Sequence, residues 1–154
     1  MKTIRWAIIG AGGIADRRAI PAILKDDSLS LVALMERVPA LAEELGKKYG
    51  VPYFSTIEEM LRTVECDAVY IGTPVACHYE QAMLALKHGK HVFIEKPLAR
   101  NEKEARALVD AFKDAGKQIR IFCDQLRAGK PDYFYADRAV QVQAVVDAVY
   151  KDNE

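Results

Sequence analysis

The sequence has no excess of charge of either sign, since 22 Lys and Arg residues balance 22 Asp and Glu residues over 154 residues. A basic excess is what draws a protein to nucleic acid or to an anionic membrane, so this balance argues against both partners. The sequence also lacks an apolar run near the roughly 20 residues that span a bilayer, and its start lacks the pattern of a signal peptide. We therefore expect a cytoplasmic protein with no nucleic-acid or membrane partner.

Cysteine and histidine are scarce, with three residues of each. Cys66, Cys77 and Cys123 are far apart, and neither a Cys-x-x-Cys pair nor a matching histidine pattern accompanies them. Structural metal sites and disulfide frameworks need such spacings or an even number of cysteines. We expect buried or half-buried thiols, with no metal site.

Hydrophobic residues make up 51% of the chain and charged residues 29%, which is typical of a soluble globular domain. Apolar runs of strand length alternate with segments of helical periodicity. Strands are expected at residues 4–9, 29–35, 53–54, 67–71, 91–94 and 119–122. Helices are expected at 14–25, 39–49 and 137–150, around Met60, between Pro74 and Gly89, and between Asn101 and Gly116. This alternation predicts an α/β fold with a doubly wound parallel sheet in three α/β/α layers.

The first apolar run stops at Gly10, and the pattern Gly10-x-Gly12-x-x-Ala15 leads directly into a helical segment. In a phosphate-binding turn the first glycine allows the tight bend, the second lets the backbone approach a pyrophosphate, and a small third residue lets helix and strand pack closely. The helix then offers its first amides to the anion. The pattern predicts a Rossmann-like dinucleotide site, although a purely structural tight turn can also use glycines.

Glu36 ends the second predicted strand, 21 positions after Ala15. A dinucleotide-binding unit places at this distance the acid that holds the adenosine ribose hydroxyls. A carboxylate there repels a 2′-phosphate, which favours NAD over NADP. Arg37 follows directly and can reach a 2′-phosphate, so NADP stays possible, as does a solvated Glu-Arg pair without a ligand.

Two further groups follow predicted strands, Thr73-Pro74 and Glu95-Lys96-Pro97. They belong at the carboxyl edge of the sheet, where open α/β folds bind ligands. A lysine held there beside a cofactor can hydrogen-bond a substrate oxygen or share its proton, whereas in isolation Lys96 is a surface lysine. His78 lies in the first turn of the next helix and is a capping, packing or proton-carrying residue.

Together with Gly89-Lys90-His91-Val92, these motifs closely resemble the glucose-fructose oxidoreductase and inositol dehydrogenase family, Gfo/Idh/MocA, over residues 3 to about 120. The resemblance implies an NAD(P)-dependent oxidoreductase, a dehydrogenase acting on sugars, cyclitols or related alcohols. It implies Lys96 as the catalytic lysine, with Glu95 lining the cofactor pocket. It also implies that the pyrophosphate is bound by Gly10, Gly12, Gly13 and Ile14. The adenosine end would contact Glu36 and Arg37, and the nicotinamide side would contact Thr73, Pro74 and His78.

The sequence departs from the family pattern in two places. Val75 stands where the family commonly has an asparagine, which removes a helix cap. Family members also continue into a second α/β domain that forms the substrate pocket, whereas residues 122–151 resemble the extreme C-terminus of such an enzyme. We expect a natural or engineered domain deletion that leaves one domain, with a dinucleotide-binding unit at 1–122 and a loop and helix at 123–154 packed on it.

This organisation predicts cofactor binding with little turnover. A homo-oligomer can form through surface that the absent domain leaves exposed. Two alternatives stay open: a non-catalytic structural or assembly module that keeps the fold without cofactor, and a reductase whose substrate site comes from a partner subunit.

Overall fold

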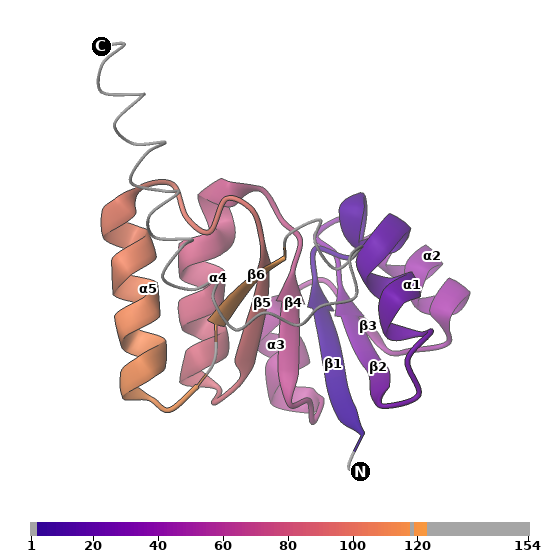
Figure 1. Cartoon of the computed structure of the whole chain (residues 1–154). Helices are drawn as coiled ribbons and strands as arrows, with labels where there is room; N and C mark the ends of the chain where they lie inside the picture. The colour runs from indigo at the N-terminus through magenta and orange to yellow at the C-terminus, as the bar shows by residue number, and fades with distance from the viewer. Residues whose placement is uncertain (1–2, 118, 123–154) are drawn as a thin grey trace.

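Six parallel strands form the sheet of the computed structural model, which describes residues 3–117 and 119–122. The strands are β1 (Ile4–Ile9), β2 (Leu29–Met35), β3 (Tyr53–Phe54), β4 (Ala68–Ile71), β5 (His91–Glu95) and β6 (Ile119–Phe122). Their order across the sheet is β3-β2-β1-β4-β5-β6, so the direction of winding reverses between β1 and β4 (Figure 1). The predicted doubly wound sheet is confirmed, including its sixth strand.

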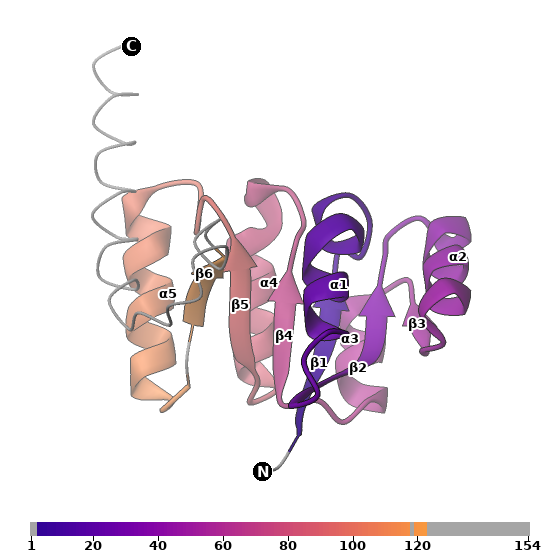
Figure 2. The same cartoon turned by 45° about the vertical axis from the view of Figure 1, so that its right-hand side comes forward.

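Helices cover both faces of this sheet (Figures 1 and 2). They are a π-helical turn η1 (Ala15–Ala19), α1 (Ile20–Ile23), α2 (Pro39–Tyr49), α3 (Ile57–Thr63), α4 (Val75–Lys87) and α5 (Glu102–Asp114). Residues of η1, α1 and α2 pack on one face around Ile8 and Leu34, whereas α3, α4 and α5 pack on the other around Ile71 and Ile94. All four of these strand residues are fully buried, so the two cores share the sheet as their common wall.

Side chains cap the first turns of two helices. The Thr56 hydroxyl accepts a hydrogen bond from the Glu59 amide at the start of α3, and the Asn101 side chain accepts one from the Glu104 amide at the start of α5. Each bond satisfies an amide that the first turn of a helix leaves without a partner. At the start of α4, by contrast, Pro74 is the cap residue and no side chain caps the helix, as expected from Val75.

The segment after the glycine turn is helical, but the prediction of one α-helix over 14–25 is wrong in its hydrogen bonding and length. Ala15–Ala19 form a π-helical turn in which the Ile20 amide donates to the Ala15 carbonyl, and α1 ends at Ile23. Pro21 has no amide hydrogen to donate to the carbonyl four residues before it, and its ring needs space in that turn. The helix therefore widens before the proline instead of bending smoothly.

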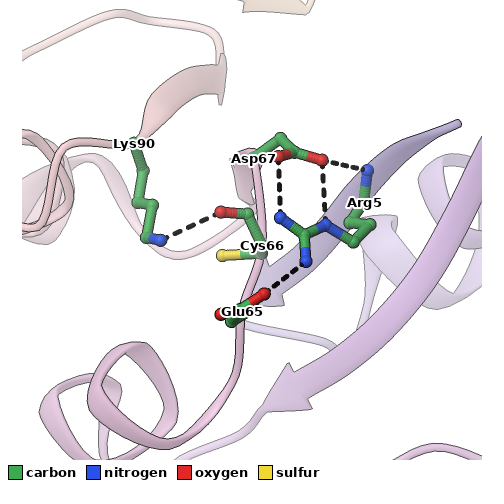
Figure 3. Close-up of polar contacts among 5 residues, drawn as sticks. All are labelled: Arg5, Glu65, Cys66, Asp67 and Lys90. Atoms are coloured by element: carbon green, nitrogen blue, oxygen red, sulfur yellow. Dashed lines mark hydrogen bonds and ion pairs between the residues drawn. The ribbon is translucent and has the colours of Figure 1, made fainter. Parts of the chain in front are cut away.

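Charged side chains meet at the edge where the strands begin, which we call the amino edge (Figure 3). The backbone amide, Nε and Nη2 of Arg5 donate to the Asp67 carboxylate at 2.9, 3.1 and 3.0 Å, and Nη1 donates to Glu65 at 2.8 Å. Lys90 Nζ donates to the Cys66 carbonyl oxygen at 2.9 Å. Strand β4 begins at Ala68, one residue later than predicted. Asp67 precedes the strand, and its carboxylate binds Arg5 of β1.

Cys66 is buried and Cys77 half-buried, as expected, while Cys123 lies outside the described residues. The predicted helix at 137–150 and the segment 123–154 also lie outside them. No helix in the described part of the chain is long and apolar enough to cross a membrane. Within those same residues, no cluster of His, Cys, Asp and Glu has the arrangement of a metal site.

Candidate cofactor site

Four strands end side by side at the opposite edge of the sheet, the carboxyl edge. Ile9 at the end of β1 pairs with Met35 of β2 and with Ile71 of β4, and Ile71 pairs with Ile94 of β5. Because these pairs are in register, the loops that follow the strands start at nearly the same level. The sheet therefore brings together the Gly10 turn, Glu36, the Thr73 loop and the Glu95-Lys96 segment, although these are far apart in sequence.

The Gly10 turn packs tightly against the loop after β4. Gly10 has φ +76°, and a Cβ atom there would lie 2.6 Å from Thr73 Cγ2 and 3.0 Å from the Thr73 backbone nitrogen. Its amide donates to the Met35 carbonyl at 2.9 Å. Only glycine meets both the backbone conformation and the close approach. The first glycine of the motif therefore shapes the turn, as the sequence predicts.

The next residues of the turn present open backbone. A Cβ atom on Gly13 would meet no atom within 4 Å, so this part of the turn faces free space. Within residues 3–117, the Gly13 and Ile14 amides donate to no protein acceptor. Open amides at the start of a helical segment attract anions. The donor set therefore fits a pyrophosphate group.

Glu36 lies opposite this turn and is held by backbone amides. Its Oε2 accepts from the Gly12 amide at 3.1 Å, and its Oε1 accepts from the Arg37 amide at 2.8 Å. The Glu36 side chain is half-buried, whereas Arg37 is exposed. The carboxylate thus stands beside the phosphate turn, in the place where the sequence predicts a contact to ribose.

His78 joins the loops after β4 and β5. Its Nε2 lies 2.7 Å from the Thr73 carbonyl oxygen and its Nδ1 lies 2.9 Å from the Pro97 carbonyl oxygen. The imidazole is 1% exposed, so it contacts protein and not solvent. Both partners are carbonyl oxygens, which only accept, so each contact is a hydrogen bond only where the facing ring nitrogen carries a proton. Of the three possibilities left open by the sequence, the packing role fits this geometry.

The Glu95-Lys96 segment combines a held carboxylate with an exposed ammonium group. Glu95 belongs to β5, one residue beyond the predicted end of the strand, and accepts a hydrogen bond from the Tyr70 hydroxyl at 2.5 Å. Lys96 is exposed, and no ion pair or hydrogen bond holds its ammonium group within the described residues. Lys96 is therefore available to a ligand, as a catalytic lysine must be.

Sequence reasoning missed Tyr70 and Gln81, both of which support this edge. Tyr70 lies in a strand that is buried throughout, and Gln81 accepts a hydrogen bond from the Thr73 hydroxyl at 2.5 Å. For Tyr70 the sequence did contain a signal: a hydroxyl group within an apolar strand, which needs a hydrogen-bond partner when it is buried. Burial, reinforced by the Glu95 carboxylate, raises the pKa of the Tyr70 phenol, which stays a donor at neutral pH.

Residues 4–122 match the profile of the Gfo/Idh/MocA family, described as an oxidoreductase family with an NAD-binding Rossmann fold. The chain belongs to this family. The Gfo/Idh/MocA match covers every described strand and helix, and it confirms the resemblance inferred from the motifs. The described domain is thus the family's dinucleotide-binding domain.

Curated and solved relatives agree with this assignment. Over 114 residues the chain is 42% identical to scyllo-inositol 2-dehydrogenase (NADP(+)) of Bacillus subtilis, covering 73% of this chain and 34% of that protein. The WlbA dehydrogenase of Bordetella pertussis, solved with NADH and UDP-GlcNAcA, is 29% identical with a TM-score of 0.75, over 79% of this chain and 37% of that one.

A second solved relative contains the phosphorylated cofactor. It is a 3-ketoreductase of Actinomadura kijaniata in complex with TDP-benzene and NADP, 28% identical with a TM-score of 0.75, over 83% of this chain and 42% of that one. Solved structures similar to this chain thus hold either NADH or NADP. The chain spans about a third of the length of the curated relatives that it matches.

Proposed function

We propose that the carboxyl edge binds a nicotinamide dinucleotide, with NAD preferred and NADP accepted. The observation that carries this proposal is the pairing of the open Gly13 and Ile14 amides with the amide-held Glu36 carboxylate across one turn. The amides would bind the pyrophosphate and the carboxylate would accept hydrogen bonds from ribose hydroxyls. Residues proposed to contact or line the site are Gly10, Gly12, Gly13, Ile14, Glu36, Arg37, Thr73, Pro74, His78, Glu95 and Lys96.

The preference for NAD depends on two adjacent side chains of opposite charge. The half-buried Glu36 carboxylate would repel a 2′-phosphate on the ribose it contacts, whereas the exposed Arg37 guanidinium would attract one. Glu36 is fixed by two amides and cannot turn away without losing them. We therefore give it the larger weight. NADP stays a ligand because relatives with either cofactor share the fold.

The proposed chemistry is oxidation or reduction at an alcohol carbon of a sugar or cyclitol, the class to which the named substrates of the relatives belong. A bound nicotinamide supplies hydride transfer. Lys96, exposed at the strand end, would hydrogen-bond the substrate oxygen and hold its proton. His78 would act indirectly, by packing between the loops that contain Thr73 and Pro97. For residues 1–154 alone we propose cofactor binding with little turnover, because the aligned segments cover only 37% and 34% of two catalytic relatives.

Calorimetric titration with NAD, NADH and NADP tests the proposal. Binding in the micromolar range with NAD tighter than NADP is the expected result, and no heat at millimolar cofactor contradicts it. Steady oxidation of inositol or glucose by this chain would contradict the low turnover.

Substitution of Gly12 separates a cofactor domain from a structural module. A Cβ atom on Gly12 would lie 3.2 Å from both Glu36 Oε2 and Leu41 Cδ2, so Gly12→Val should displace the carboxylate. A ligand at 100 times its dissociation constant stabilises a protein by about 2.7 kcal/mol, and Gly12→Val should lose most of that stabilisation. Identical melting of the unsubstituted chain with and without cofactor would instead favour the structural module.

A further inference from the structure

Tyr70 and Glu95 form a polar pair at the carboxyl edge, where Glu95 is one of the proposed site residues. Tyr70 pairs with Phe93 in the register of β4 and β5, and Glu95 follows two residues later. Side chains two residues apart in a strand share a face, so Tyr70 and Glu95 lie on the same side of the sheet. The hydroxyl of Tyr70 donates to Glu95 Oε1 at 2.5 Å. The pair thus links the ends of two neighbouring strands.

The Tyr70 ring is the fixed member of this pair. Tyr70 is 2% exposed, and a Cβ atom on Gly72 would lie 2.8 Å from its Cε1 atom, so the ring packs directly against the loop after β4. The same hypothetical atom would lie 3.2 Å from the Gly10 carbonyl oxygen and 3.5 Å from Ala15 Cβ. Tyr70 also belongs to the buried cluster that contains Ala11 and Ala15, so its ring is enclosed by packed side chains and has little room to turn.

The Glu95 carboxylate is the adjustable member. Glu95 is only half-buried, and its side chain has three rotatable bonds. Within the described residues, Tyr70 is the one hydrogen-bond partner of this side chain. A carboxylate accepts hydrogen bonds at both oxygens, so a bond at Oε1 leaves Oε2 able to accept from a ligand. Without the hydroxyl, Glu95 would gain rotational freedom that ligand binding must then remove.

We infer that Tyr70 is a positioning residue for the cofactor: its buried hydroxyl orients the Glu95 carboxylate so that the second oxygen accepts a hydrogen bond from an amide or hydroxyl group of the dinucleotide. This inference rests on the proposed function. Tyr70 itself contacts no ligand, because its ring is enclosed. Its effect on affinity passes through Glu95.

The test measures NADH affinity by calorimetry for four variants and the unsubstituted chain. Tyr70→Phe removes only the hydroxyl and should weaken NADH binding about tenfold, the effect of one hydrogen bond to a charged group. Glu95→Gln should weaken it by at least as much. The double variant should bind no more weakly than Glu95→Gln, since Tyr70 acts through that side chain. Tyr53→Phe, on the exposed edge strand β3, is the matched control and should not alter affinity.

Each result decides between positioning and plain packing. If Tyr70→Phe lowers the melting temperature but binds NADH like Tyr53→Phe, Tyr70 is a packing residue and the inference is wrong. Additive losses in the double variant would also overturn it. Should Tyr70→Phe fail to fold, Glu95→Gln still decides, because unchanged affinity there removes the step through Glu95. No NADH binding by the unsubstituted chain would refute the proposed function itself, before any substitution is made.

Discussion

The two edges of the sheet use charge in different ways. At the amino edge, the Arg5 guanidinium is surrounded by the carboxylates of Asp67 and Glu65, so its hydrogen-bonding capacity is used within the chain. At the carboxyl edge, the Lys96 ammonium has no such partner in the described part of the chain. The charges at the amino edge hold strands together, whereas the carboxyl edge leaves the Lys96 ammonium exposed.

The backbone at the two edges differs in how closely its turns are packed. Left-handed glycines occur at both edges, but a Cβ atom on Gly50, Gly89 or Gly116, in the turns before β3, β5 and β6, would meet nothing within 4 Å. At the carboxyl edge, left-handed Gly10 packs directly against Thr73. Polar groups without protein partners lower stability, and proteins accept them at functional sites. Substitutions at the two edges should therefore separate stability from binding.

The largest effect is expected from Gly10→Val. The left-handed conformation costs a β-branched residue about 1–2 kcal/mol, and the overlap with Thr73 adds about 1–3 kcal/mol. We expect a loss of roughly 3 kcal/mol in the free energy of unfolding and no detectable cofactor binding. Chemical denaturation and calorimetry measure the two effects.

Gly13→Ala is the matched control for this substitution. Gly13 also has positive φ, +60°, but a Cβ atom there meets no neighbour within 4 Å. The cost should be about 1 kcal/mol, from backbone conformation alone. Equal destabilisation by the two substitutions would show that the contact between Gly10 and Thr73 does not constrain the turn.

Asp67→Asn should destabilise the amino edge without affecting the site. Asp67 accepts three hydrogen bonds from Arg5, and its side chain is 29% exposed. The melting temperature should fall by roughly 3–6 °C, while the dissociation constant for NADH stays unchanged. Glu65→Gln is the control, since Glu65 contacts the same guanidinium with 88% of its side chain exposed and should change little. Weaker NADH binding by Asp67→Asn would show that the edges are coupled.

The sequence predicts the fold better than it predicts the supports of the site. Strands β2, β3 and β6 have the expected bounds because each is a short apolar run between turn residues. The Glu36 position follows from its spacing to Ala15, which is local information. The contact of His78 with Pro97 and that of Tyr70 with Glu95 depend on which strands become neighbours, and no local pattern carries that. The π-helical turn shows the same limit, since Pro21 predicts a disturbance but not its geometry.

Lys96→Met should affect binding and leave stability unchanged, the reverse of Asp67→Asn. Lys96 is exposed, so its replacement should move the melting temperature by no more than about 1 °C. NADH binding should weaken about threefold to tenfold, because Lys96 is also one of the residues proposed to contact the cofactor and one hydrogen bond to the dinucleotide would be lost. Lys87→Met, an exposed lysine at the end of α4, serves as the control with no effect on either quantity. A large drop in melting temperature for Lys96→Met would mean that this lysine supports the fold.

The smallest expected effect is a pH dependence of stability that arises at the amino edge. Burial, with the Lys117 ammonium, lowers the pKa of His91 at the start of β5, and the Asp67 carboxylate opposes this only in part. Between that lowered pKa and the ordinary value near 6.5, the unfolded chain binds more protons than the folded chain, so stability falls as the pH falls through this window and is fully present above it. Melting temperatures at pH 7.5, 6.5 and 5.5 should decrease by about 2 °C overall, and His91→Gln should reduce this decrease.

Asp16, beside the glycine turn, titrates in a separate range, because hydrogen bonds from Lys48 and Tyr49 lower its pKa and its contribution is lost only under more acidic conditions. If the melting temperature of His91→Gln changes with pH as much as that of the unsubstituted chain, a group other than His91 causes the pH dependence. The pH dependence would then no longer distinguish the amino edge from the carboxyl edge.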